Sequence, residues 1–391
     1  MKILIMDIMK PLGKDGSTIH RWELARNLAK LGCKVYAISY TDNSSEEGLH
    51  ICLLPKNKIK YVIQLLKLVT RHRFDIIYTR NIMKGIIGFL IRRLRNSKLV
   101  IEVNSISPDE WRFVEKQLSG KIKRCRDIKI KFLKYLEIFV IKKADAVIVV
   151  THGIKNYLVN HKVDENKVWV IGNGANTDLF KPIRDKNILQ QLRNRLHINN
   201  NEKVILFVGN LAPWQGVEYL IRSAPLIIEE VPKTKFLIVG DGIMREKLES
   251  MVRELELEEK FIFTGRVPYE KVPIFINISD VCVCPSPVNS YFRISGGSSL
   301  KIFEYLACGK PVVTGNIRGD GDLVVNSGSG FAVMSEDYAE LAGAIIKLLK
   351  NEKLRLQMGE NGRKTIVEYH SWERIAKKVV EIFEKIIREK G

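Results

Sequence analysis

The chain has 391 residues, of which 46% are hydrophobic and 28% charged, which is typical of a soluble globular protein with an ample core. No run approaches the roughly 18 apolar residues of a membrane span, and the length favours two domains of roughly 150–200 residues each. The formal net charge of +20 favours polyanionic partners, such as nucleic acid, anionic lipid headgroups or phosphorylated substrates.

The first half of the chain alternates strands and helices. A strand at 2–8 is followed by a loop at 10–17 and a helix at 18–31, which Gly32 ends. Further strands are expected at 34–39, 75–78, 99–103, 146–150 and 168–171. This pattern predicts a doubly wound α/β domain over residues 1–172, whose ligands lie at the carboxyl ends of its strands. Gly16 falls at such an end, but its loop lacks the GxGxxG spacing of a dinucleotide site.

Polar residues follow two of these predicted strands. Arg80 comes after the strand at 75–78, and Glu102 and Asn104 stand at the end of the strand at 99–103. Because the carboxyl ends of parallel strands share one edge of a sheet, we expect these side chains to gather there with Gly16.

Two basic amphipathic stretches lie in the first half. Residues 121–143 hold nine Lys and Arg against Asp127 and Glu137, with apolar residues at helical spacing, and 56–73 has the same character. Such a helix suits an anionic membrane surface. The alternative is that its apolar face packs on the sheet and its basic face is solvated, and both can hold at once. Nucleic acid is the least expected partner, since no reader motif is present.

The second half repeats the pattern. A Gly/Asn-rich turn at 172–182 leads to strands expected at 203–208, 235–239, 261–263 and 281–284. Gly-rich or polar loops follow these strands and contain Gly240, Gly265 and Arg266. We therefore expect a second α/β domain over residues 180–370, with amphipathic helices near 338–350 and 372–389 closing the chain.

The stretch at 295–313, SGGSSLKIFEYLACGKPVV, is a Gly/Ser-rich loop, a helix expected at 298–307 and a buried strand. The first turn of that helix offers backbone N–H groups to a phosphate or diphosphate. Lys301 in this turn is unfavourable for the helix dipole unless an anion is bound nearby. Glu304 lies on the same helical face and suits a ribose diol. The alternative is an ordinary capped helix with a Lys301–Glu304 ion pair.

Cysteine usage argues against a metal centre. The six cysteines are irregularly spaced, which favours reduced thiols in the cytosol. Cys282 and Cys284 share one face of a predicted strand and are expected in the core, since no second Cys or His pair accompanies them. We expect no metal and no cofactor.

The motifs as a set resemble those of the family 4 glycosyltransferases of GT-B fold. In the second half they are VGNLAPWQG (208–216), FLIVGDGIMREKLE (236–249), FTGRV (263–267), DVCVCPS (280–286) and KIFEYLACGKPVV (301–313). In the first half they are HRWELARNLAKLGCKV (20–35), IIYTR (76–80), IEVN (101–104) and NGANTDLFKP (173–182). The resemblance implies two Rossmann-like domains facing across a cleft, an acceptor in the first, a nucleotide-sugar donor in the second, and retention at the anomeric carbon. It also implies that the last helix, 372–391, packs back on the first domain.

The chain departs from the family signature at three positions. Glu304 matches the second glutamate of the family's Glu-x7-Glu, which binds the nucleotide ribose, but the first falls at Gly296. The family's diphosphate-binding Arg and Lys fall at Asn210 and Gln215. Lys301, with Arg293 or Arg266, is the expected replacement for these two cations.

The resemblance assigns residues to three roles. The expected catalytic residues are Lys301, Glu304 and Arg293. The expected acceptor residues are Arg80, Glu102 and Asn104. The expected donor residues are Gly16, Asn210, Gln215, Gly240, Gly265, Arg266, Ser298, Ser299, Leu300, Lys301 and Glu304.

The resulting hypothesis is a retaining, metal-independent glycosyltransferase in the cytoplasm, peripheral on the inner face of the cell membrane. It would use a UDP- or GDP-sugar and a lipid-linked, glycolipid or polysaccharide acceptor, and a phosphate oxygen of the donor would take the acceptor proton. One alternative is a non-catalytic binding or regulatory subunit of the same fold, which the lost Arg, Lys and Glu favour. Another is a sugar-phosphate enzyme of similar fold, such as an epimerase or a phosphorylase.

Overall fold

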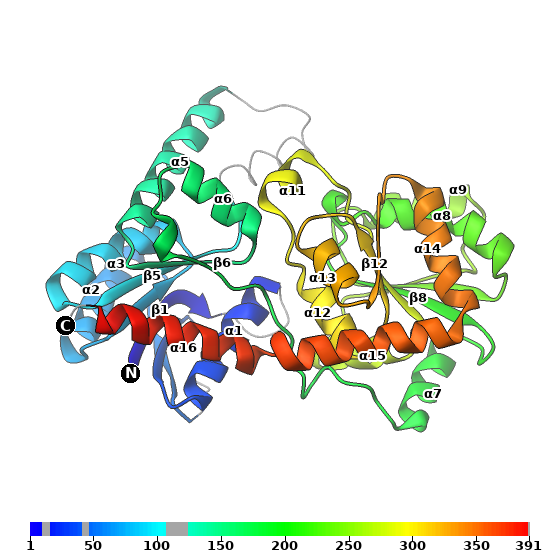
Figure 1. The fold of residues 1–391 in the computed structure, drawn as a ribbon, viewed down its shortest axis with the longest axis horizontal. Coiled ribbons are helices and arrows are strands. Elements are labelled where there is room, and N and C mark those ends of the chain that lie inside the picture. Colours follow the sequence, from blue (N-terminus) through cyan, green and yellow to red (C-terminus); the bar gives the residue numbers. More distant parts are fainter. Residues whose placement is uncertain (10–15, 41–46, 107–123, 390–391) are drawn as a thin grey trace. The chain divides into compact units, whose positions relative to one another are not determined.

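The computed structural model describes residues 1–9, 16–40, 47–106 and 124–389 (Figure 1). It divides into two compact units. Unit 1 holds residues 1–173 and 372–391, and unit 2 holds residues 174–371. Most of the predicted loop at 10–17 and the start of the basic stretch at 121–143 lie outside the described residues.

Unit 1 is built on a parallel sheet of seven strands in the order β3-β2-β1-β4-β5-β6-β7. The strands are β1 (Lys2–Met9), β2 (Lys34–Ser39), β3 (Leu49–Leu53), β4 (Ile76–Thr79), β5 (Lys98–Val103), β6 (Ala146–Val149) and β7 (Val168–Val170). The order reverses between β1 and β4, which makes this point of the edge the usual place for a ligand. Strand β3 was not predicted, because it is a short, half-exposed edge strand.

The helices of unit 1 cover both faces of this sheet. They are α1 (Gly16–Lys30), α2 (Lys58–Arg71), α3 (Ile82–Arg95), α5 (Arg124–Lys143), α6 (His152–Asn160) and α16 (Trp372–Arg388), with a 3₁₀ turn η1 (Glu165–Lys167). In Figure 1, α1 and α16 lie on one face, and α3 and α5 lie on the other. Helix α1 begins two residues earlier than predicted, so Gly16 and Ser17 are in its first turn. The N–H groups of such a turn lack partners within the helix.

Helix α16 completes the core of unit 1, although the whole of unit 2, residues 174–371, separates it from the rest of that unit. Its buried side chains recur at helical spacing: Trp372, Ile375, Ala376, Val379, Ile382, Phe383 and Ile386. They pack against α1. Trp372 meets the His20 ring edge to face with centroids 4.8 Å apart, and Phe383 lies 6.1 Å from the ring of Tyr78.

Unit 2 is built on a second parallel sheet, of six strands in the order β10-β9-β8-β11-β12-β13. The strands are β8 (Lys203–Val208), β9 (Thr234–Val239), β10 (Phe261–Gly265), β11 (Val281–Cys284), β12 (Val312–Gly315) and β13 (Gly330–Val333). The order reverses between β8 and β11. Strand β13 was not predicted, because its four residues include Gly and Ala and give no strong strand pattern.

The helices of unit 2 surround this sheet. They are α7 (Lys186–Arg195), α8 (Val217–Glu230), α9 (Arg245–Glu254), α10 (Val272–Asn277), α11 (Ser290–Ser295), α12 (Leu300–Ala307), α13 (Asp320–Asn326), α14 (Tyr338–Lys350) and α15 (Glu352–Tyr369), with 3₁₀ turns η2 (Pro213–Gln215) and η3 (Tyr269–Lys271). Helix α8 packs on α14, and α12 on α15. Across the described residues of both units, no helix combines the length and the apolar character needed to traverse a membrane.

Helix α12 begins two residues later than predicted. Ser299 has φ −78° and ψ 113°, an extended conformation. Hydrogen bonds from its N–H and hydroxyl groups to Asp320 hold it outside the helix.

We expect Phe383→Ala in α16 to destabilise unit 1 by about 3–5 kcal/mol, since removing a fully buried aromatic ring leaves a cavity. Urea unfolding of the full chain, followed by a probe in unit 1, measures this loss. Ile387→Ala on the same helix is the control: its side chain is 37% exposed, and the expected cost is below about 1 kcal/mol. Equal losses for the two variants would contradict the packing described for α16.

Candidate functional site

Three glycines stand at the carboxyl ends of neighbouring strands in unit 2. Gly209 follows β8, Gly240 follows β9, and Gly265 ends β10. Their φ angles are +152°, +138° and +70°, and a Cβ on Gly240 would lie 1.8 Å from the Gly209 carbonyl oxygen. The backbone conformation therefore disfavours a side chain at all three positions, and at Gly240 there is also no space for one. The result is an edge of bare backbone that a ligand can approach closely.

Lys301 lies over this edge. A Cβ on Gly209 would be only 2.9 Å from Lys301 Nζ, and Nζ stands 4.4 Å from the centroid of the Phe207 ring. The ammonium also donates a hydrogen bond to Gln215 Oε1. Burial lowers the pKa of Lys301, while Cys284, Asp320 and Glu304 oppose that shift. The site thus holds a cation whose partners are an aromatic face and a neutral amide, an arrangement that an anion would stabilise.

Glu304, one turn further along α12, is buried and faces a different element. Its Oε1 accepts a hydrogen bond of 3.0 Å from the Tyr269 hydroxyl in η3. Lys301 is held by Gln215 in η2. The hydrogen bonds of the two side chains therefore lead to separate loops of the edge, rather than forming the simple ion pair considered above.

Asp320, which sequence reasoning missed, holds the start of α12. Its Oδ1 accepts the Ser299 N–H at 2.8 Å and its Oδ2 accepts the Ser299 hydroxyl at 2.6 Å. Asp320-Gly321-Asp322 is an Asp-x-Asp sequence that could have drawn attention to it. Asp322, however, accepts the N–H of Gly319, so the two carboxylates point to different groups. Within the described residues, no three His, Cys, Asp or Glu side chains are placed to hold a metal ion.

The other predicted donor residues of unit 2, and Arg293, which was predicted to be catalytic, lie in loops after strands, on α11 or at the start of α12. Arg266 and Arg293 are exposed, one after β10 and the other on α11. Asn210 is exposed beside Gly242, where a Cβ would lie 2.6 Å from Asn210 Oδ1. Ser298 and Leu300 flank Ser299 at the start of α12.

The position of the absent signature glutamate has a strained backbone. Gly296 ends α11 with φ +71° and ψ −175°. A side chain is unfavourable at this conformation, so the backbone here suits Gly296 and not a glutamate.

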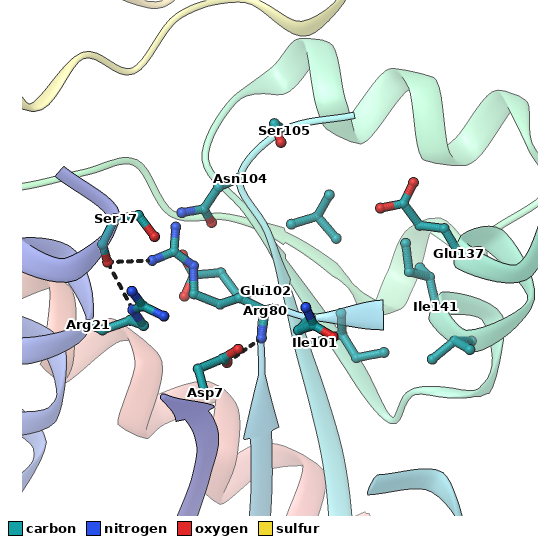
Figure 2. Close-up of a pocket in the computed structure, with 13 residues that line it drawn as sticks. Asp7, Ser17, Arg21, Arg80, Ile101, Glu102, Asn104, Ser105, Glu137 and Ile141 are labelled. Atoms are coloured by element: carbon teal, nitrogen blue, oxygen red, sulfur yellow. Dashed lines mark hydrogen bonds and ion pairs between the residues drawn. The ribbon is translucent and has the colours of Figure 1, made fainter. Parts of the chain in front are cut away.

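Unit 1 has a pocket of about 260 Å³ at the carboxyl ends of β1, β4 and β5, where the strand order reverses (Figure 2). Its polar lining is Asp7, Ser17, Arg21, Arg80, Asn81, Glu102, Asn104, Ser105 and Glu137, and Ile101, Val103, Val140 and Ile141 form its apolar side. The pocket thus brings together the three predicted residues Arg80, Glu102 and Asn104. Gly16 lies one residue before Ser17, in the same turn of α1.

Arg80 is fixed from three directions. Its backbone N–H donates to Asp7 Oδ2 at 2.6 Å, its Nη1 donates to the Ser17 carbonyl at 3.2 Å, and its Nε lies 3.5 Å from Glu102 Oε1. Arg21 Nε donates to the same Ser17 carbonyl at 3.1 Å, as Figure 2 shows. Two guanidinium groups therefore meet at one oxygen at the mouth of the pocket.

Glu102 is a buried carboxylate with three partners. It accepts a hydrogen bond from the Tyr78 hydroxyl, and its Oε1 lies 2.9 Å from His20 Nε2. Burial by itself raises the pKa of Glu102, but Arg80, His20 and Tyr78 together lower it to about 2. His20 Nδ1 continues the chain of contacts to Asn173 Oδ1 at 2.7 Å. Glu102 is thus an ionised anchor that keeps Arg80 in place.

Three further pocket residues were not singled out from the sequence. Asp7 interrupts the apolar run of β1, at a register shift between Ile5 and Ile8 that redirects the strand. Arg21 and Glu137 come from helices, where charged residues are too common to indicate a site. A lone carboxylate inside a buried strand is the signal that could have identified Asp7.

The two sites suit different chemistry. The backbone edge of unit 2, with Lys301 and the N-terminus of α12, suits a phosphate or diphosphate. The pocket of unit 1 has one polar and one apolar side. The buried Asn104 Oδ1 has no hydrogen-bond donor among the described residues, and a ligand hydroxyl group can supply one.

We expect Glu102 to make the stability of unit 1 depend on pH. Its folded pKa of about 2 lies below the ordinary value of 4.5, so its contribution is complete above pH 4.5 and is lost as the pH falls toward 2. Between pH 6 and pH 3 this loss is about 2 kcal/mol. Urea unfolding at the two pH values should show a smaller pH dependence for Glu102→Gln than for the wild type. Glu165→Gln, at an exposed carboxylate, should match the wild type; equal pH dependence for Glu102→Gln would contradict the role given to Glu102.

Known proteins resemble both halves of the chain. The sequence of the protein family described as Glycosyltransferase Family 4 matches residues 14–179. The sequence of the family described as Glycosyl transferases group 1 matches residues 189–365. The UDP-Gal:alpha-D-GlcNAc-diphosphoundecaprenol alpha-1,3-galactosyltransferase of Escherichia coli is 28% identical over 313 residues, which are 79% of this chain and 75% of that protein.

Solved structures share the fold over nearly the whole chain. Sucrose-phosphate synthase from Thermosynechococcus elongatus has a TM-score of 0.78 at 22% identity, with 99% of each chain covered. Anabaena HepE in complex with UDP-glucose has a TM-score of 0.77 at 18% identity, with 98% of this chain and 100% of that chain covered. The two Rossmann-like sheets are those of the GT-B fold. The matches to both halves show that the chain belongs to the group 1/family 4 glycosyltransferases.

Proposed function

We propose that this protein is a retaining hexosyltransferase that moves a sugar from a nucleotide diphosphate-sugar to a glycolipid or polysaccharide acceptor. The observation that carries the proposal is the position of Lys301. Its ammonium lies against Gly209 at the bare backbone edge of unit 2 and beside the N-terminus of α12. The donor binds at this edge, and the acceptor binds in the pocket of unit 1.

Lys301 supplies the positive charge for the donor diphosphate. The two cations that family resemblance places at 210 and 215 are Asn and Gln in this chain. Gln215 instead accepts a hydrogen bond from Lys301, which keeps the ammonium at the edge when no anion is bound. The exposed Arg266 and Arg293 add positive charge to the same edge of unit 2. The dipole of α12 contributes in the same direction.

Glu304 binds the ribose of the nucleotide. It is buried on α12, and the Tyr269 hydroxyl already fills one of its hydrogen-bonding positions. A carboxylate accepts several hydrogen bonds in a fixed geometry, which suits the two hydroxyl groups of a ribose diol. The rigid helix fixes the carboxylate relative to Lys301, which lies one turn earlier.

The reaction proceeds by positioning and charge stabilisation, without a metal. As the bond from the sugar to the diphosphate loosens, negative charge grows on the leaving phosphate. Lys301 and the α12 N-terminus stabilise that charge. The leaving phosphate oxygen takes the proton of the acceptor hydroxyl, which attacks the same face of the sugar. The sugar therefore keeps its anomeric configuration, and no protein nucleophile is needed.

The pocket of unit 1 holds the sugar end of the acceptor. Its volume of about 260 Å³ and its mixed polar and apolar lining suit one sugar unit. Asn104 Oδ1 accepts a hydrogen bond from a hydroxyl group of the sugar, and Arg80, anchored by Glu102 and Asp7, donates hydrogen bonds. A relative named for a diphosphoundecaprenol-linked acceptor supports a lipid-linked substrate.

An exposed aromatic surface on α5 supports a peripheral position on the membrane. Phe132, Tyr135 and Phe139 are 62%, 72% and 45% exposed, and their spacing places them on one face of the helix. Lys143 Nζ of the same helix stands 5.7 Å from the centroid of the Phe139 ring. The opposite face buries Ile138 and Ile141. The aromatic face binds anionic lipid on the cytoplasmic side of the cell membrane.

A second candidate function is a non-catalytic subunit that binds nucleotide-sugars or a partner. The observation that favours it is the loss of two expected cations, with Gln215 hydrogen-bonded to the one lysine that could replace them. The two functions differ in turnover. Hydrolysis or transfer of a radiolabelled UDP- or GDP-sugar supports the enzyme, while binding without any turnover in the presence of membrane extract supports the subunit.

We expect the wild type to bind UDP or GDP in calorimetric titration and Lys301→Ala to bind it at least tenfold more weakly, since the main cation of the phosphate site is lost. Lys347→Ala is a matched control, because Lys347 Nζ also lies over a phenylalanine ring, 5.0 Å from that of Phe331. The control should bind as the wild type does. Equal affinities for Lys301→Ala and the wild type would remove Lys301 from the donor site.

We expect the triple variant Phe132→Ser, Tyr135→Ser, Phe139→Ser to lose binding to vesicles of phosphatidylcholine with phosphatidylglycerol. The wild type should bind these vesicles at low salt, and much less without the anionic lipid or at high salt. Co-sedimentation measures the bound fraction. The matched control is Ile243→Ser, Leu356→Ser, two exposed apolar residues of unit 2 at 66% and 61% exposure. If both variants bind like the wild type, α5 is not the membrane-binding face.

A further inference from the structure

The N-terminus of α12 is capped by a residue of another helix. Ser299 stands at the N-cap position, and its side chain makes no capping bond to its own helix. Instead its N–H and its hydroxyl both donate to the carboxylate of Asp320, at 2.8 and 2.6 Å. Asp320 is the first residue of α13, 21 residues further along the chain. One carboxylate therefore serves the starts of two helices.

Two glycines make room for this arrangement. A Cβ on Gly297 would lie 2.5 Å from Asp320 Oδ2, and a Cβ on Gly319 would lie 2.4 Å from the Gly297 carbonyl oxygen. Gly319 also has φ +95°, and the Gly297 N–H donates to the Arg318 carbonyl at 2.9 Å. The two loops are thus fitted together at the backbone. This close fit fixes where Asp320 can stand.

The carboxylate cannot itself be a main contact for a ligand. Asp320 is 2% exposed, and both of its oxygens already accept hydrogen bonds from Ser299. The negative charge of Asp320 nevertheless acts on Lys301. Burial lowers the pKa of Lys301, and Asp320 opposes that shift. Burial raises the pKa of Asp320, against the two Ser299 hydrogen bonds and the charge of Lys301. Asp320 therefore acts on the site through Ser299 and through the turn that carries Lys301.

We propose that Asp320 is the positioning residue of the donor site: by capping α12 from α13 it holds the Ser299–Lys301 turn in the conformation that binds the diphosphate. Because the Ser299 N–H is taken, the diphosphate binds the N–H groups of Leu300 and Lys301 and the Lys301 ammonium. This inference deepens the proposed function and depends on it. Asp320 is buried and lies outside the family signature. It orders a loop in which Gly296 stands at the position of the signature glutamate.

The test is a double-mutant cycle on nucleotide binding, with UDP and GDP as the probes in calorimetric titration of the full chain. Asp320→Ala should weaken binding of the preferred nucleotide at least tenfold. In the Lys301→Ala background the same change should cost less than threefold, because the turn no longer presents its ammonium. Asp320→Asn keeps an acceptor for the Ser299 N–H and should recover most of the affinity.

Asp337→Ala is the matched control for lost helix capping. Asp337 accepts the Ala339 and Glu340 N–H groups at 3.0 Å each and caps α14 of the same unit. Its removal should lower the unfolding temperature and leave nucleotide affinity unchanged. If Asp320→Ala binds as tightly as the wild type, or if its effect is fully additive with that of Lys301→Ala, the positioning role is overturned. If the wild type binds neither nucleotide, the proposed donor site fails and this inference fails with it.

Discussion

The close approach of Gly209 to Gly240 is the constraint on which the site of unit 2 depends. Parallel strands bring their carboxyl ends to one edge, but side chains on the following residues would normally cover that edge. Here the contact distances leave no space for a Cβ on Gly240, and the backbone of three strand ends stays bare. Lys301 then lies close to this bare backbone at Gly209. A ligand with several oxygens can be held there mostly by groups that cannot move.

The two units stabilise a buried charge in different ways. In unit 1 the carboxylate of Glu102 is surrounded by Arg80, His20 and Tyr78, so its ionised form is stable without any ligand. In unit 2 the ammonium of Lys301 lies over an aromatic ring and donates a hydrogen bond to a neutral amide. The first arrangement suits a structural anchor. The second leaves electrostatic stabilisation to be gained when an anion binds.

Most of the fold could be predicted from the sequence, because the strands that build the centre of each sheet are nearly continuous apolar runs. Strands β2, β8 and β11 have the predicted bounds. The short outer strands β3 and β13 could not be predicted, since few of their residues are buried on both faces. The predicted start of α12 was wrong by two residues. The carboxylate of Asp320, 21 residues further along the chain, accepts the Ser299 N–H and holds Ser299 outside the helix.

The candidate site could be predicted only where residues follow strands directly. Arg80, Glu102 and Asn104 share a pocket because their strands are neighbours, which the order of elements implies. Three other residues of the two sites stand on helices: Arg21, Glu137 and Asp320. Their positions near the strand ends depend on how the helices pack on the sheets, which no local sequence pattern predicts. On α5 the spacing of apolar residues predicted an amphipathic helix but not which apolar residues face the core: Phe132, Tyr135 and Phe139 lie on the solvent side, while Ile138 and Ile141 are buried.

The return of α16 to unit 1 has a consequence for how the chain is made. Residues 174–371 leave the ribosome as an uninterrupted segment and contain all of unit 2, so that unit can fold while synthesis continues. Unit 1 must wait for α16, although residues 1–173 are translated before unit 2. Until α16 emerges from the ribosome, the surface of α1 that this helix covers is exposed to water and to other chains. A helix that is translated after all of unit 2 is therefore the one that closes unit 1.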